Sequence, residues 1–132
     1  MEIETLDGQP VGIVTVGQPW RARIGFRVVS AQRQFVIGLG LKAADGAAIQ
    51  TAWYPPEAVA PGDYEVIFSQ SQVCLEAGTY TVIVGLNESD RCLQQIEAAR
   101  LDITSENPAG YFPFTSGAGT VLNSMPVTLR RL

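Results

Sequence analysis

The side chains of this sequence that are best suited to chemistry surround three glycines, Gly38, Gly40 and Gly85, in the middle of expected strands. Glycine weakens a strand interior and usually marks close approach of another group to the backbone. Sugar hydroxyl groups take bidentate polar partners, and the apolar face of a pyranose stacks on an aromatic ring. The pattern therefore predicts a shallow trough that binds a sugar, with candidate contacts at Lys42, Gln50, Trp53, Tyr54, Thr81, Asn87, Gln95 and Glu97.

Trp53 is the candidate whose orientation the strand pattern does not support. Alternation over residues 48–54 places Gln50 and Tyr54 outward and turns Trp53 inward. We include Trp53 because it lies at a strand end beside a proline loop, where a ring can emerge. The alternative is that the glycines only set the twist of the sheet, or let a second copy of the chain pack against it.

The residues that catalysis would need are absent or isolated. The sequence has no histidine, which is the commonest general base and metal ligand. Ser69, Ser71 and Cys74 have no base within a recognisable motif, and neither a Gly-x-Ser-x-Gly elbow nor a phosphate-binding loop is present. Asp63 and Glu65 share one face of a strand, but we expect a solvated pair rather than a glycosidase dyad. We therefore predict that the domain is not an enzyme and holds no cofactor.

Two cysteines without a histidine cannot form an ordinary zinc site, so we expect no metal. We expect Cys74 and Cys92 to be reduced thiols, because a domain of this size does not need a disulfide for stability.

Length and charge narrow the class of protein further. The 132 residues form one domain, and 9 basic against 13 acidic side chains give a net charge of −4. Proteins that bind nucleic acid carry a basic footprint, which is missing here. No apolar run approaches the ~20 residues that cross a bilayer, and Met1 is followed by a strand-like segment rather than a secretory signal. We expect a cytosolic chain, or a piece of a longer protein.

The candidate sugar contacts lie on segments that we expect to be short strands. In the segment Trp20–Val29 apolar side chains occupy the even positions and three arginines occupy odd ones, which is typical of a strand with one dry and one wet face. About nine such strands separated by turns predict an all-β fold, an immunoglobulin-like antiparallel β-sandwich. We expect strands over residues 3–6, 12–16, 19–29, 35–43, 48–54, 64–69, 79–87, 92–104 and 120–132, with loops over 55–62 and 105–119.

These strands are expected to divide between two sheets. Strands 19–29 and 64–69 would share one sheet, and the strands beginning at residues 35, 48, 79 and 92 would form the other and carry the trough. On the first sheet, outward charges would pair across the strands and form a solvated surface rather than a basic patch. These charges are Arg21, Arg23, Arg27, Asp63 and Glu65.

Several segments of the sequence follow one another in a characteristic order and spacing. They are Gly17-Gln18-Pro19-Trp20, Phe35 to Leu41 with Ala44-Asp45-Gly46, Pro61-Gly62-Asp63-Tyr64, Leu75-Glu76-Ala77-Gly78-Thr79-Tyr80 and Ala98 to Ile103. Together these segments resemble the C-terminal domain of Wzt, the ATP-binding subunit of the ABC transporter that exports O-antigen polysaccharide in Gram-negative bacteria. The resemblance covers roughly residues 3–122.

The resemblance implies a β-sandwich that binds the exported O-antigen polysaccharide, often at its modified non-reducing end. It also implies a homodimer that exchanges a C-terminal strand, here within residues 120–132, and contact with the membrane subunit through the parent chain. The location would be cytoplasmic, at the inner membrane. Two alternatives stay open: a structural or dimerisation sandwich, and an accessory glycan-binding domain of a glycan-modifying enzyme.

Overall fold

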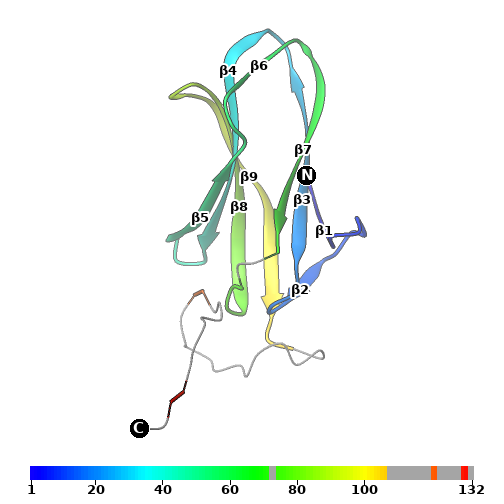
Figure 1. Cartoon of the computed structure of the whole chain (residues 1–132), viewed down its shortest axis with the longest axis vertical. Coiled ribbons are helices and arrows are strands. Elements are labelled where there is room, and N and C mark those ends of the chain that lie inside the picture. Colours follow the sequence, from blue (N-terminus) through cyan, green and yellow to red (C-terminus); the bar gives the residue numbers. More distant parts are fainter. Residues whose placement is uncertain (72–73, 107–119, 122–128, 131–132) are drawn as a thin grey trace.

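The computed structural model describes residues 1–71, 74–106, 120–121 and 129–130. Every regular element in this part of the chain is a strand, which confirms the all-β prediction (Figure 1). The strands are β1 (Glu2–Glu4), β2 (Ile13–Thr15), β3 (Trp20–Val28), β4 (Gln32–Ala43), β5 (Ala48–Trp53), β6 (Glu57–Val59), β7 (Gly62–Gln70), β8 (Gly78–Glu88) and β9 (Arg91–Thr104).

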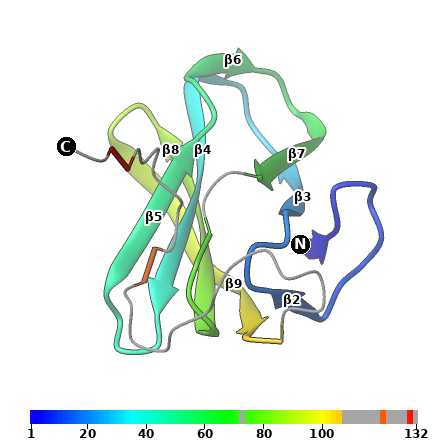
Figure 2. The ribbon, with the colours of Figure 1, turned by 60° about the horizontal axis from the view of Figure 1, so that its bottom comes forward.

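The strands form two sheets that pack face to face as a sandwich (Figures 1 and 2). The three-stranded sheet has the order β1-β3-β7, and the six-stranded sheet has the order β2-β9-β8-β4-β5 with β6 also on β4. This division confirms the expected sheets of six strands: β3 and β7 share one sheet, and β4, β5, β8 and β9 share the other. One pairing departs from the predicted antiparallel arrangement: β2 runs parallel to β9, because the chain crosses from one sheet to the other after β1.

Alternation along the central strands builds the core between the sheets. Alternate residues of β3, β4 and β8 are buried, and they include Trp20, Ile37, Leu41 and Val82. Because side chains two apart share a face, the same register turns the intervening glycines of β4 and β8 away from the core. The core therefore fixes which side chains reach the outer face of the six-stranded sheet.

The structure differs from the expected elements at three places. Strand β6 lies inside the predicted proline loop, where Glu57 pairs with Phe35 on the part of β4 that extends beyond β5. Strand β1 ends at Glu4 instead of residue 6, since a turn closed by the bond from the Thr5 amide to the Gln9 carbonyl follows it. The predicted loop over 105–119 and strand over 120–132 lie almost entirely outside the described residues.

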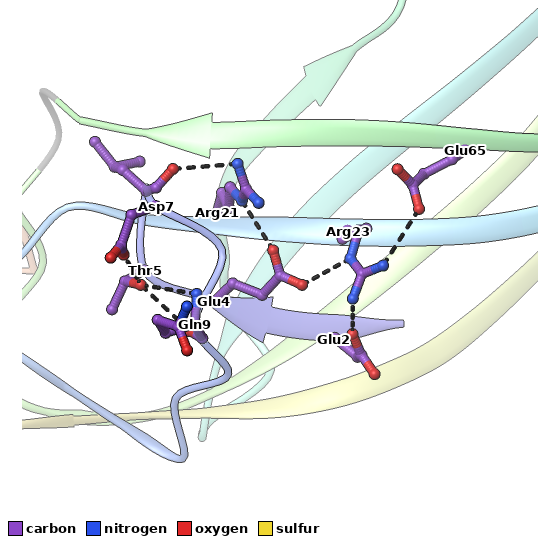
Figure 3. Close-up of polar contacts among 9 residues, drawn as sticks. Glu2, Glu4, Thr5, Asp7, Gln9, Arg21, Arg23 and Glu65 are labelled. Atoms are coloured by element: carbon purple, nitrogen blue, oxygen red, sulfur yellow. Dashed lines mark hydrogen bonds and ion pairs between the residues drawn. The ribbon is translucent and has the colours of Figure 1, made fainter.

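Charged side chains on the outer face of the three-stranded sheet pair as the sequence predicts. Arg27 forms a bidentate ion pair with Asp63, at 2.6 and 3.1 Å. Arg23 lies 3.5 Å from Glu65 and also binds Glu4 at 2.6 Å (Figure 3). The result is a solvated, self-neutralising surface.

The two cysteines do not form a disulfide with each other, as predicted: Cys74 is buried and Cys92 is exposed. Burial raises the pKa of the Cys74 thiol, and a backbone hydrogen bond from Gly17 opposes this effect only in part. Within the described ranges, no helix is long and apolar enough to cross a membrane.

Candidate functional site

A cross-strand row on the outer face of the six-stranded sheet forms the centre of the site. Trp53 of β5 pairs with Gly38 of β4, Gly38 pairs with Gly85 of β8, and Gly85 pairs with Gln95 of β9. Two adjacent strands thus lack side chains at the same level. The indole of Trp53 covers Gly38, which is buried, so the backbone that stays bare in this row is that of Gly85, next to Gln95.

The next row along the sheet joins Thr51, Gly40, Ile83 and Glu97 in the same strand order. A Cβ atom at Gly40 would lie 3.8 Å from Thr51 Oγ1 and 3.9 Å from Ile83 Cβ, which are ordinary contact distances. The hydroxyl group of Thr51 and the aliphatic side chain of Ile83 therefore stand on either side of the glycine.

Together these rows enclose a hollow of about 220 Å³. Glycines of β4 and β8 form its floor, and polar and apolar side chains form its walls. Its lining residues are Gly38, Gly40, Leu41, Lys42, Ala48, Gln50, Thr51, Trp53, Ile83, Gly85, Asn87 and Gln95. The predicted glycine-floored trough thus coincides with a hollow in the structure.

Trp53 points outward, so the orientation predicted from alternation is wrong. Its side chain is 66% exposed, and a Cβ atom at Gly38 would lie 3.2 Å from Trp53 Cδ1 and 3.4 Å from Nε1. The cause is a β-bulge: Leu41 pairs with Gln50 while Lys42 pairs with Ala48, which leaves Ile49 as an extra residue. Every residue of β5 after Ile49 therefore faces the side of the sheet opposite to the one that simple alternation predicts.

Gln50 changes face for the same reason. Its side-chain oxygen accepts a hydrogen bond of 2.6 Å from Gln70 Nε2 of β7, so this amide spans the space between the two sheets. The part of Gln50 that lies near the hollow is its backbone carbonyl, 3.8 Å from a Cβ atom at Gly40. The predicted outward placement of the Gln50 side chain is corrected accordingly.

Tyr54 also lies away from the hollow. It lines a separate cavity of about 140 Å³ between the sheets, together with Phe26 and Tyr64. A hydrogen bond to the Glu57 carboxylate, followed by the charge of Glu57 and by burial, raises the pKa of the Tyr54 hydroxyl group. The structure thus separates Tyr54 from the other candidates.

The remaining candidates keep the predicted face. Lys42, Asn87 and Gln95 line the hollow. Glu97 lies in the second row and Thr81 pairs with Lys42 in the row beyond it, but neither of the two lines the hollow. Sequence reasoning missed Thr51 and Ile83. Thr51 was hidden by the bulge, and Ile83 could have been found from its position midway between Thr81 and Gly85, because side chains two apart share a face.

The chemistry of the lining suits noncovalent binding of a neutral or anionic molecule. Lys42 forms no ion pair within the part of the chain that the structure describes, and no carboxylate lines the hollow there. Nor do the described residues hold a group of three or more histidine, cysteine or acidic side chains that could bind a metal ion.

Comparisons with known proteins agree on one family. The sequence matches the family model of the Wzt C-terminal domain over residues 1–113. The structure resembles the crystal structure of the C-terminal domain of Wzt with a TM-score of 0.68 and 14% sequence identity, over 80% of this chain and 71% of that chain. No curated protein matches the sequence. At this identity the structural likeness shows a shared fold.

Proposed function

Because this chain belongs to the Wzt C-terminal domain family, we propose that it binds O-antigen polysaccharide for export by an ABC transporter, without catalysing a reaction. The observation that carries this proposal is the exposed indole of Trp53, which lies over Gly38 and beside the bare backbone of Gly85. A pyranose ring can approach the backbone there and place its apolar face against the indole.

Polar groups around the floor would bind the sugar hydroxyl groups. The amides of Asn87 and Gln95 each offer hydrogen-bond donors and an acceptor. They suit a hydroxyl group, because a hydroxyl group both donates and accepts hydrogen bonds. Thr51 adds a hydroxyl group and Lys42 an ammonium group on the opposite side. These groups fix orientation, while stacking on Trp53 provides apolar contact.

The wider setting of the domain is part of the same proposal. A recognition domain of this family would act at the cytoplasmic side of the inner membrane, where its parent chain hydrolyses ATP and contacts the membrane subunit. The domain would then hold the polysaccharide close to the transporter.

We also propose that the domain is a homodimer in which residues of the segment 120–132 are exchanged. One edge of β9 supports this, because among the described strands β2 covers β9 only at Asp102, Ile103 and Thr104. As far as the described residues show, the remaining edge of β9 leaves backbone donors and acceptors available for another strand. Leu129, which is 99% exposed, is an apolar residue of the segment that such pairing could cover.

The test of the binding proposal is an NMR titration with O-polysaccharide from the source strain and from an unrelated serotype. We expect signals of Gly38, Gly40 and Gly85 to shift with the cognate polysaccharide alone. No shifts with either polysaccharide would contradict the proposal and favour the structural or dimerisation alternative.

Replacing Trp53 by alanine tests the stacking contact itself. Stacking that buries about 60 Å² of apolar surface, at roughly 25 cal/mol per Å², contributes about 1.5 kcal/mol, or about tenfold in Kd. We therefore expect Trp53→Ala to weaken polysaccharide binding about tenfold in calorimetry, with a nearly unchanged Tm. Ile67→Ala, on the outer face of the other sheet and 45% exposed in the native chain, is the matched control and should leave Kd unaltered.

A further inference from the structure

The centre of the hollow is apolar, although its rim is polar. Ile83 lies between Thr81 and Gly85 on the outward side of β8, and it is half-buried. Its Cβ atom is 3.9 Å from the position that a Cβ atom at Gly40 would take. An aliphatic side chain beside a glycine floor creates a small apolar site within the proposed sugar-binding face.

Strand spacing relates this apolar site to the indole of Trp53. The row of Ile83 is adjacent to the row of Trp53, and β4 alone separates β5 from β8. Neighbouring strands are about 4.8 Å apart, so β5 and β8 are separated by about 10 Å. The indole of Trp53 lies over Gly38, so a single pyranose stacked on it can extend over Gly85 and bring one edge of its ring to Ile83.

Ile83 offers only an aliphatic surface, and this determines which substituent of the sugar is favoured at that edge of the ring. A hydroxymethyl group there would lose hydrogen bonds to water without gaining a partner from an isoleucine, which is unfavourable. A methyl group would bury apolar surface in the same place, which is favourable. An N-acetyl group would bring an amide N–H and a carbonyl over the floor, and each would need a partner.

Given the proposed function, we infer that the hollow binds a 6-deoxyhexose unit of the polysaccharide, with the C6 methyl group packed against Ile83. The substrate class is thus a glycan that contains 6-deoxy sugars. Ile83 is the residue that sets this specificity, because it contacts the atom by which a 6-deoxyhexose differs from its parent hexose.

The experiment compares methyl glycosides that differ only at C6. We would titrate the ¹⁵N-labelled chain with methyl α-L-rhamnoside against methyl α-L-mannoside, and with methyl α-L-fucoside against methyl α-L-galactoside. The reporter is the indole N–H signal of Trp53, and the signal of Trp20, which is 4% exposed, is the internal reference. We expect the deoxy member of at least one pair to bind about tenfold more tightly.

Ile83→Thr keeps a β-branched residue and adds a hydroxyl group. We expect it to reduce the preference for the deoxy sugar to within about twofold. Ile67→Thr, on the outer face of the three-stranded sheet, is the matched control and should keep the full preference.

Three results would overturn the inference. They are equal binding within both pairs, an unchanged preference in Ile83→Thr, and tighter binding of methyl N-acetylglucosaminide than of either deoxy sugar. If the cognate polysaccharide still shifts Trp53 in those cases, only the 6-deoxy specificity fails. If neither the polysaccharide nor any glycoside shifts Trp53, the proposed function fails with it.

Discussion

At the scale of single residues, Gly38 allows the indole of Trp53 to lie against the sheet. A methyl group at residue 38 would meet Trp53 Cδ1 at 3.2 Å, which is tighter than ordinary contact. The indole must then move away from the backbone. The absence of one methyl group thus determines where the aromatic surface of the site lies.

We therefore expect Gly38→Ala to shift the indole N–H signal of Trp53 in the free protein and to weaken polysaccharide binding severalfold. NMR and calorimetry measure the two effects. Gly12→Ala is the matched control, because a Cβ atom at Gly12 meets nothing within 4 Å and the effect on the unfolded chain is the same. An unmoved Trp53 signal in Gly38→Ala would contradict this account.

Gln50 and Gln95 have the same side chain but different surroundings, so their alanine variants should separate stability from binding. Gln50→Ala leaves the amide of Gln70 without its partner between the sheets, which costs about 1 kcal/mol in the free energy of unfolding. Polysaccharide affinity should remain unchanged. Gln95→Ala should weaken binding and leave the urea midpoint unaltered, since this side chain is exposed and lines the hollow. Loss of affinity in Gln50→Ala would show that its side chain reaches the sugar.

At the scale of elements, β1 is held to β3 by a buried carboxylate between two guanidinium groups. Glu4 is 1% exposed and binds Arg21 at 2.9 Å and Arg23 at 2.6 Å (Figure 3). Burial opposes ionisation of Glu4, but the hydrogen bonds and charges of the two arginines outweigh it and hold the pKa of the carboxyl group below its usual value of 4.5. The ion pairs therefore make the edge of the three-stranded sheet sensitive to acid.

Because the pKa of Glu4 is lower in the folded chain than in the unfolded chain, its contribution to stability is complete above about pH 4.5 and is lost as the pH falls through the folded value. We expect Glu4→Gln to have a lower Tm than the native chain at pH 7, and we expect this difference to shrink as the pH falls below 4.5. Glu2→Gln is the control, because its side chain is more than half exposed and should matter less. A constant difference in Tm across this range would rule out the ionised Glu4 as its source. Arg100 and Thr79 also lower the pKa of Asp102 in the folded chain. The stability of the native chain and of both variants should therefore decrease somewhat with falling pH even without Glu4.

The elements also show which parts of the molecule the sequence could predict. Strict alternation in β3, β4 and β8 correctly predicted their buried faces and the outward glycines. Alternation failed in β5, because the bulge at Ile49 is set by pairing with β4 and leaves no mark in the residue types of β5 itself. Strand β6 was missed because Pro55 and Pro61 flank it, and flanking prolines resemble those of a loop.

At the scale of the whole molecule, the two outer faces of the sandwich have different chemistry. The face of the three-stranded sheet satisfies its own charges, since Arg27 binds Asp63 and Arg23 binds three carboxylates. The face of the six-stranded sheet is hollowed, and no ion pair of its Lys42 occurs among the described residues. This difference explains why the proposed recognition falls on one face only.

The proposed strand exchange predicts the mass of the assembly. Removing residues 122–132 deletes most of the segment and leaves all nine described strands in place. Light scattering should then report a monomer instead of a dimer, with Tm as the check that the shortened chain folds. A folded, shortened chain that remains dimeric would contradict the exchange and direct attention to another interface.

The bulge at Ile49 also matters when this chain is aligned with its relatives. A relative that lacks the extra residue would carry its outward aromatic ring one place earlier in β5, although the two rings would occupy the same point in space. Aligning such sequences without a gap at Ile49 would equate Trp53 with an inward residue. The proposed sugar contacts should therefore be compared between members of this family by strand register rather than by sequence number.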